Sequence, residues 1–244
     1  MTECWNERTQ LLLGEDGLAR LAQARVLVAG LGGVGGACAE SLVRAGIGTV
    51  WLLDHDVFGA SNLNRQLLAT EAVLGRAKAA VAAERLASLG TGAALIPLPI
   101  FLAESAVAGL LDELAPDAVA DCIDTVGVKA ELLMQARARG IATMTALGAG
   151  NRLDAGAVRL GRLDQVQGCG LGRALRTRIK RAGVPRDFPV VYSTELPVKK
   201  PAPHVPNESG IRPRAINGTI SYLPNIFGHM VAGELIRRLL RETP

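Results

Sequence analysis

Apolar residues in the first 150 positions alternate between short continuous runs and segments with helical spacing. The runs have the length and apolar character of buried parallel strands, and the segments between them repeat apolar residues every three or four positions. This alternation predicts a doubly wound α/β fold with a mainly parallel sheet. The expected strands are 25–30, 48–54, 93–100, 118–124 and 141–150, and the expected helices are 18–24, 33–46, 75–90, 104–117 and 129–140.

The pattern changes after Gly150, where the segments become shorter and more polar. A Pro-rich polar stretch predicts a loop of low order, and the chain closes with an amphipathic helix whose apolar side needs a partner surface. We therefore expect one domain, 1–244, with a core over 1–150 and an antiparallel C-terminal extension over 151–244. The expected elements of the extension are an antiparallel strand at 157–163, a basic helix at 169–183, a strand at 189–194, the loop at 199–214 and the helix at 221–240.

Composition narrows the class of protein. The 244 residues are 49% hydrophobic but only 3% aromatic, so the core must be aliphatic and rich in alanine. Four scattered cysteines without a C-x-x-C pair argue against a structural zinc site and favour the reducing cytoplasm. The polar N-terminus shows no signal peptide, and no apolar run reaches the roughly 18 residues of a membrane span. We expect a cytoplasmic protein.

A glycine-rich loop joins the first expected strand to the helix after it. Gly30, Gly32, Gly33 and Gly35 lie in a G-x-G-x-x-G pattern. Glycines here permit a tight turn and a close approach of backbone to phosphate, and the helix N-terminus offers free N–H groups to the anion. A tight turn without a ligand is the alternative, but the flanking strand and helix are the context that the motif requires. The loop predicts a Rossmann-like nucleotide-binding core.

Polar residues after the second strand distinguish between nucleotides. Asp54 lies at the strand tip, 24 positions after Gly30, where a carboxylate can accept the ribose hydroxyls of NAD or of ATP. A nicotinamide cofactor needs no further cation there, whereas an arginine can bind two phosphate oxygens of a triphosphate and amides can orient others. We therefore expect ATP. The arginine and amides are Asn62, Asn64, Arg65 and Gln66.

Two more side chains are candidates for binding the triphosphate and its metal. Lys78 lies beside Arg76 in the first turn of a helix, where the dipole disfavours cations by about 0.3–1 kcal/mol unless an anion is near. A solvated surface lysine is the alternative. Asp124 ends the fourth expected strand, at the edge that faces the ligand crevice, and its carboxylate can bind Mg²⁺. Asp121 is the alternative metal ligand, but we expect it in mid-strand.

Positive charge is concentrated in the extension. The net charge is +4, but residues 169–215 hold ten Lys and Arg against three Asp and Glu, which makes that segment +7 and the remainder −3. A solvated basic face is the alternative to a binding surface. A nucleotide-binding core joined to a basic segment nevertheless favours a polyanionic partner, above all nucleic acid.

Four stretches together resemble the adenylating enzymes related to ThiF, MoeB and the ubiquitin-activating proteins: GLGGVG, LDHDVFGASNLNRQ, GRAK and DCID, within about residues 8–150. Members of that family bind ATP with Mg²⁺ and adenylate a carboxylate. The resemblance also implies a homodimer in which Arg8 enters the partner subunit's site, unless it is a surface helix arginine. The implied roles are ribose binding for Asp54, phosphate contacts for Asn62, Arg65 and Lys78, an accessory contact for Gln66, Mg²⁺ binding for Asp124, and catalysis for Arg8, Arg65, Lys78 and Asp124.

Within that family, GAGNRLD, VVYSTE and the closing helix are similar to the branch of tRNA threonylcarbamoyladenosine dehydratases. Members activate the threonylcarbamoyl carboxylate, on the adenosine beside the anticodon, as an acyl-adenylate. The urea group of the same side chain then closes the ring and expels AMP. The resemblance implies a tRNA bearing threonylcarbamoyladenosine as the substrate. It leaves open a sulfur-transfer partner protein and an alkali-metal ion near residues 148–154.

The alternative function is adenylation of the C-terminus of a ubiquitin-like or sulfur-carrier protein. That branch typically carries C-x-x-C pairs or a sulfurtransferase domain, and the 244 residues contain neither. Cys169 could form a thioester, but no activating base lies beside it in sequence, and Cys38 and Cys122 are expected in the core. A nucleotide-gated RNA-binding module is a third class, which Arg65, Lys78 and Asp124 together disfavour.

Overall fold

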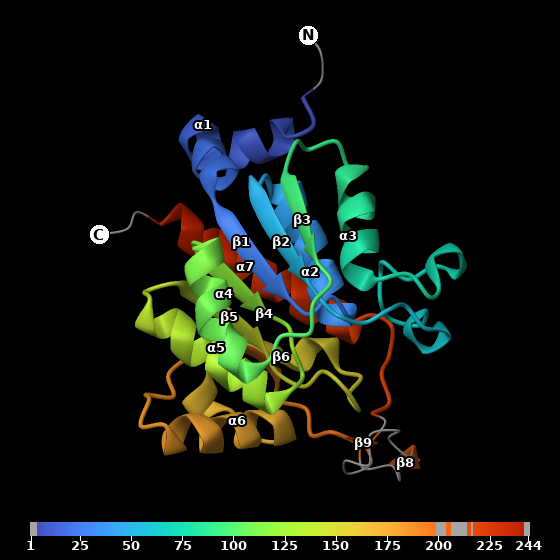
Figure 1. Cartoon of the computed structure of the whole chain (residues 1–244), viewed down its shortest axis with the longest axis vertical. Coiled ribbons are helices and arrows are strands. Elements are labelled where there is room, and N and C mark those ends of the chain that lie inside the picture. Colours follow the sequence, from blue (N-terminus) through green and yellow to red (C-terminus); the bar gives the residue numbers. More distant parts are fainter. Residues whose placement is uncertain (1–3, 199–203, 206–213, 216, 242–244) are drawn as a thin grey trace.

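A computed structural model of the chain describes residues 4–198, 204–205, 214–215 and 217–241. Its centre is a seven-stranded sheet in the order β3-β2-β1-β4-β5-β7-β6, and Figure 1 labels these strands except β7. The neighbours pair in parallel except β6 with β7, which confirms the expected fold class. The strands are β1 Arg25–Ala29, β2 Thr49–Leu53, β3 Ala94–Leu98, β4 Ala118–Asp121, β5 Ala142–Ala146, β6 Val158–Arg162 and β7 Pro189–Ser193, with a separate pair of β8 His204–Val205 and β9 Arg214–Ala215.

Helices cover both faces of the sheet. Val26 and Val28 of β1 face the layer of α2, α3 and α7, and Leu27 and Ala29 face α4 and α5, because successive strand residues point to opposite faces. Among the described residues, no helix combines the length and apolarity that a membrane span needs. The helices are α1 Glu7–Gln23, α2 Gly33–Ala45, α3 Lys78–Ala87, α4 Val107–Leu114, α5 Val126–Ala138, α6 Gly170–Arg181 and α7 Leu223–Leu240.

Two elements differ from the expected ones in ways that matter for the site. α1 is longer than the expected helix and is interrupted at Gly14, whose φ is 71°. β4 ends at Asp121 instead of Asp124, because the neighbouring strand β1 has already ended: the register pairs Ala29 with Asp121, and the chain leaves strand geometry at Gly30, with φ 89°. Residues 122–125 therefore form a connection to α5.

The closing helix finds its partner surface within the same chain. α7 lies against α2, where a Cβ on Gly228 would overlap the carbonyl oxygen of Val34. Its apolar residues Phe227, Val231 and Leu235 are buried in the core that contains α2. The partner surface that its apolar side needs is therefore supplied by the same chain, and α7 carries no argument for a dimer. The Pro-rich stretch expected at 199–214 lies mostly outside the described residues.

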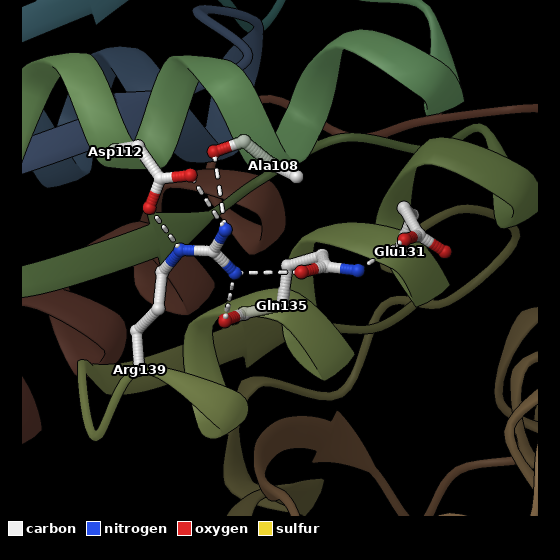
Figure 2. Close-up of polar contacts among 5 residues, drawn as sticks. All are labelled: Ala108, Asp112, Glu131, Gln135 and Arg139. Atoms are coloured by element: carbon white, nitrogen blue, oxygen red, sulfur yellow. Dashed lines mark hydrogen bonds and ion pairs between the residues drawn. The ribbon is translucent and has the colours of Figure 1, made fainter.

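An ion pair joins the helices on the other face of the sheet (Figure 2). Nε and Nη2 of Arg139 donate to the two carboxylate oxygens of Asp112 on α4, at 2.7 and 2.9 Å. The Nη1 atom donates to the Gln135 side chain at 2.6 Å, and Gln135 donates to Glu131 at 2.8 Å. The Arg139 guanidinium lowers the pKa of the Asp112 carboxyl. The α4–α5 layer is thereby held by charge as well as by its apolar contacts.

Candidate nucleotide-binding site

The glycine loop lies where the order of the strands reverses. β1 pairs with β2 on one side and with β4 on the other. Ligands of doubly wound sheets bind at such a switch point, beyond the carboxyl ends of the strands. Residues 30–35 follow β1 at this edge, and residues 122–125 follow β4 at the same edge. The structure therefore brings the loop and the connection that carries Asp124 together.

Close backbone contacts account for most of the glycines in the loop. A Cβ on Gly35 would overlap the carbonyl oxygen of Gly30, and one on Gly30 would lie 2.9 Å from the Cys122 carbonyl oxygen. A Cβ on Gly33 would lie 2.9 Å from Cβ of Pro224. At Gly32 the nearest atom would be Nε2 of Gln66, at an ordinary 3.7 Å. Packing thus explains three of these glycines, and the fourth faces the side chain of Gln66.

Asp54 follows the last residue of β2 and braces the loop. Its Oδ2 accepts a hydrogen bond from Leu31 N at 2.7 Å, and its Oδ1 accepts one from Asp56 N at 2.9 Å. An ionised carboxylate has about four acceptor positions, so two remain for hydroxyl groups. Ribose binding by Asp54 stays a prediction, and the structure adds a second task, holding the loop against β2.

The arginine and amides after Asp54 form a turn at this edge. Asn62 Oδ1 accepts from Gly59 N at 3.0 Å, and Asn64 Nδ2 donates to Thr219 O at 3.0 Å. Arg65 Nη1 donates to Ser61 O at 2.8 Å and to Asn64 Oδ1 at 3.0 Å. Both asparagines therefore shape the turn. The expected phosphate contacts of Asn62 and Arg65 stay predictions, and the bonds within the turn leave fewer of their polar atoms for a ligand. Arg65 keeps further N–H groups that can bind an anion.

Gln66 is the most enclosed amide of this group. Its residue is only 6% exposed, and Oε1 finds no hydrogen-bond partner among the described residues. A buried acceptor without a partner costs about 1–3 kcal/mol. Since its amide lies beside Gly32, a ligand on the glycine loop is in reach of that side chain. We expect Gln66 to contribute more than the accessory contact that the resemblance implies.

Lys78 is not a solvated surface lysine. It opens α3 and is 5% exposed, and its Nζ lies 3.0 Å from Oδ2 of Asp56. The anion that the helix dipole requires is therefore present in the chain as Asp56, while Arg76 pairs with Glu84. Asp54, His55 and Asp56 also gather possible metal ligand atoms within 4.8 Å of one another. Lys78 and backbone N–H groups already donate to three of the carboxylate oxygens in this group.

The two candidate metal carboxylates have different surroundings. Asp121 is fully buried; Lys129 Nζ lies 2.9 Å from its Oδ2, and Thr145 Oγ1 donates to the same oxygen at 2.5 Å. Asp121, and not Asp124, ends the strand, so the positional reason for preferring Asp124 was wrong. Asp124 is exposed in the connection after β4. Its role as the metal ligand stays a prediction, which now rests on its exposure instead of its position in the strand.

Arg8 lies apart from these residues. It is exposed on the first half of α1, and Figure 1 shows α1 beside the opposite end of the sheet from the carboxyl ends of β1 and β4. Leu11 and Leu12 on the same half of α1 are 80% and 82% exposed. At spacings of three and four residues, they share a helix face with Arg8. This face, and not α7, is the apolar surface that a second chain could cover.

The cysteines have structural surroundings. Hydrogen bonding to Cys122, together with burial, raises the pKa of the Cys38 thiol well above its ordinary value, which keeps it protonated. Cys169 is buried, and its Sγ accepts from Gly172 N at 3.4 Å as the N-cap of α6. A buried capping thiol suits packing better than covalent catalysis.

Arg152 lies in the loop 148–154, for which the sequence left the presence of an alkali-metal ion open. It is 5% exposed, and its guanidinium donates to the carbonyl oxygens of Gly148 at 2.6 Å, Glu195 at 2.8 Å and Gly168 at 3.1 Å. Carbonyl oxygens are also the ligands that an alkali-metal ion would use. Of these three carbonyls only that of Gly148 belongs to the loop, so Arg152 supplies a positive charge there and occupies part of the oxygen set that an alkali-metal ion would need.

Several of these residues could not be named from sequence alone. Lys129 carried a weak signal, as a lysine among apolar positions at the start of α5, next to DCID. Asp56 carried a signal as well, as a second carboxylate two residues after Asp54. Arg152 carried none, because the carbonyl groups that it binds come from three separate segments.

Known proteins resemble this chain over different shares of its length. The ThiF family model matches residues 6–244. A tRNA threonylcarbamoyladenosine dehydratase of Bacillus subtilis is 28% identical over 240 residues, which are 96% of this chain and 94% of the relative. A crystal structure of the Escherichia coli tRNA N6-threonylcarbamoyladenosine dehydratase in complex with ATP superimposes with a TM-score of 0.85 and 28% identity, covering 98% of this chain and 96% of that one. A molybdopterin-synthase adenylyltransferase of Escherichia coli is 38% identical over 117 residues, which are 48% of this chain and 46% of the relative.

Proposed function

The chain belongs to the ThiF family, and on that premise we propose that it is an ATP-dependent enzyme that cyclises the threonylcarbamoyl group on the anticodon-adjacent adenosine of tRNA. One observation carries this proposal: the likeness to the dehydratases extends over nearly the whole chain in sequence and in fold, including the extension. The likeness to the molybdopterin-synthase adenylyltransferase covers 48% of the chain. A tRNA substrate also supports a cytoplasmic location.

ATP fits the site described above. The free N–H groups at the start of α2 can bind phosphate, and Asp54 retains acceptor positions for the ribose. Arg65 adds positive charge that a triphosphate requires and a nicotinamide dinucleotide does not, and Lys78 adds more where a phosphate takes the place of Asp56. We therefore expect calorimetry to detect ATP binding and no NAD binding, and NAD binding without ATP binding would contradict the proposal.

The reaction requires positioning and charge neutralisation more than a protein nucleophile. A carboxylate oxygen of the threonylcarbamoyl group attacks the α-phosphorus, and pyrophosphate leaves. The urea group then attacks the acyl carbon, loses a proton and expels AMP. We infer that the exposed Asp124 carboxylate would hold Mg²⁺, which takes one or two carboxylates plus substrate phosphates and would neutralise the leaving pyrophosphate. Because ring closure is intramolecular, the capped Cys169 has no step to perform.

We also propose that the enzyme acts as a homodimer in which Arg8 completes the partner subunit's site. The arginine lies on α1, at the other end of the sheet from the glycine loop, so it cannot serve its own site without a large movement. Leu11 and Leu12 beside it are exposed, and a second copy of the chain would bury them. Arginines supplied from a partner subunit can stabilise charge in phosphoryl transfer.

The alternative is adenylation of a carrier-protein C-terminus, which the partial likeness to the adenylyltransferase supports. Pyrophosphate and AMP release separate the two functions. The protein with ATP is incubated with tRNA bearing threonylcarbamoyladenosine, with the same tRNA lacking the modification, and with a carrier protein ending in Gly-Gly. We expect AMP and loss of one water from the modified nucleoside only with the first. ATP–pyrophosphate exchange with the carrier alone would establish the alternative.

A further inference from the structure

We propose that the exposed cationic face of α6 binds the phosphate backbone of the tRNA and leads the modified adenosine to the nucleotide site. We call this surface the α6 face; it consists of Arg173, Thr177, Lys180, Arg181 and Arg186. The proposal rests on the proposed function for the identity of its ligand. Within the basic segment 169–215, it assigns the contact with the polyanion to one surface that the structure describes.

The α6 face is charged along its length. α6 carries five Lys and Arg and no acid over Gly170–Arg181. Arg173, Thr177 and Arg181 are four residues apart, so they form one row of about 12 Å along the helix. Two adjoining hollows of about 510 and 550 Å³ lie on the helix, and Arg173, Thr177 and Arg181 line both. A row of donors beside open hollows suits an extended chain of anions.

Not every cation of the helix is available to a ligand. Arg176 donates to the carbonyl oxygens of Leu163 and Val166, at 3.2 and 2.5 Å, and Arg178 pairs with Glu104. The contacts of these two residues hold α6 in place, so Arg176 and Arg178 are left out of the α6 face.

The remaining cations stand close together without neutralisation. Arg173, Lys180, Arg181 and Arg186 are exposed, and their side chains form no hydrogen bond or ion pair with any other residue that the structure describes. Cations that share one surface repel one another, and a bound polyanion would relieve that repulsion.

The α6 face adjoins the nucleotide site. Val126, two residues after Asp124, lines the first hollow together with Arg173 and Arg181. Glu104 pairs with Arg178 and also lies against Gly127, at the N-terminus of α5. Figure 1 shows α6 at the end of the molecule toward which the parallel strands point. A tRNA backbone on α6 would therefore pass the connection that carries Asp124, which an unrelated basic patch would not do.

The test removes three cations and measures the salt dependence of tRNA binding. The variant combines Arg173→Gln, Lys180→Gln and Arg181→Gln, and the matched control, with the same change of net charge elsewhere, combines Arg44→Gln, Arg85→Gln and Arg237→Gln. The probe is tRNA bearing threonylcarbamoyladenosine, titrated by filter binding over a series of KCl concentrations. Removing one interaction with a phosphate lowers the log–log slope by about 0.7–0.9, so we expect a slope smaller by about 2 in the α6 variant and affinity reduced at least about tenfold.

Kinetics provide the second measurement. In the α6 variant, KM for the tRNA should rise while the affinity for ATP stays that of the wild type, because none of the three residues lies in the glycine loop or the turn after β2. A slope equal to that of the control variant would overturn the proposal and leave α6 free for another partner, such as an acidic protein. A wild-type protein that binds the tRNA through α6 but never cyclises it would overturn the proposed function and leave this surface standing.

Discussion

Lys129→Met is expected to destabilise the protein strongly. The wild-type ammonium and the Asp121 carboxylate lie 2.9 Å apart, and both side chains are 0% exposed. Methionine has nearly the length of lysine and no charge, so the substitution leaves the Asp121 carboxylate buried with Thr145 as its remaining side-chain donor. Removing one partner of a buried ion pair costs about 3–5 kcal/mol, because the other charge stays uncompensated.

The magnitude can be checked by removing the second charge as well. Asp121→Asn keeps an acceptor for Thr145 and has no charge, so the double variant with Lys129→Met should regain part of the lost stability. What remains is the loss of the bond from Lys129 Nζ to the Ile123 carbonyl, 2.8 Å in the wild type, which is worth about 1.5–3 kcal/mol for a charged donor. The double variant should therefore be clearly more stable than Lys129→Met alone.

Urea unfolding of the wild type and the variants, at one fixed chain concentration, measures these differences. The concentration must be held constant because dimerisation would shift the apparent stability. For a domain of this size, 3–5 kcal/mol corresponds to a fall in Tm on the order of 10 °C. A Lys129→Met protein within about 1 kcal/mol of the wild type would refute the reasoning, since the pair would then behave like an exposed one.

The same variants separate stability from positioning. Lys129 also holds the backbone of residues 121–123, which lead directly to Asp124. The double variant lacks these hydrogen bonds to the backbone, although it regains part of the stability. We expect its tRNA cyclisation to stay low at saturating ATP. Full activity in the double variant would show that Lys129 has a purely structural role.

The remaining predictions concern the metal ligand, the dimer, the loop of Arg152 and an ion pair at low pH. Asp124→Asn should lose most Mg²⁺-dependent turnover with an unchanged Tm; undiminished turnover in the steady-state assay would place the metal on another residue. Mixed chains of Arg8→Ala and Asp124→Asn should recover about a quarter of wild-type activity, because half of the random dimers own one intact site of two; no recovery after confirmed subunit exchange would rule out a contribution from the partner. Arg152→Gln should lower stability by about 2–4 kcal/mol in urea unfolding, and the wild-type Tm should be the same in potassium and tetramethylammonium chloride; selective stabilisation by potassium would contradict the assignment of Arg152 as the cation of that loop. Arg139 lowers the pKa of Asp112 in the folded state. The stabilisation by this pair is therefore present above the ordinary carboxyl pKa and is lost as pH falls through the lowered pKa. The Tm difference between wild type and Asp112→Asn should shrink below about pH 4, and a constant difference down to pH 2 would argue against the pair.

Local patterns were sufficient for the fold class and for the position of the glycine loop at the switch point of the sheet. The alternation of apolar runs and helical segments is a property of neighbouring residues, and a doubly wound sheet places the first strand–helix turn at the ligand crevice wherever the pattern occurs. The demand for glycine at 30 and 35 is equally local, because the turn brings the backbone of one against the other. The position of Asp54 at the same edge of the sheet was predicted from its spacing in sequence from that turn.

Tertiary contacts decided which polar side chains face a ligand. Asp121 and Asp124 are three residues apart in one short stretch, and their difference depends on where β1 ends and on Lys129 reaching back from α5. On α6, Arg176 turns to backbone carbonyls of a neighbouring segment while Arg173 stays exposed. Burial and hydrogen-bond partners depend on segments that are distant in sequence. For that reason the sequence determines the net charge of a segment, whereas only the tertiary structure determines which of its charged side chains are exposed.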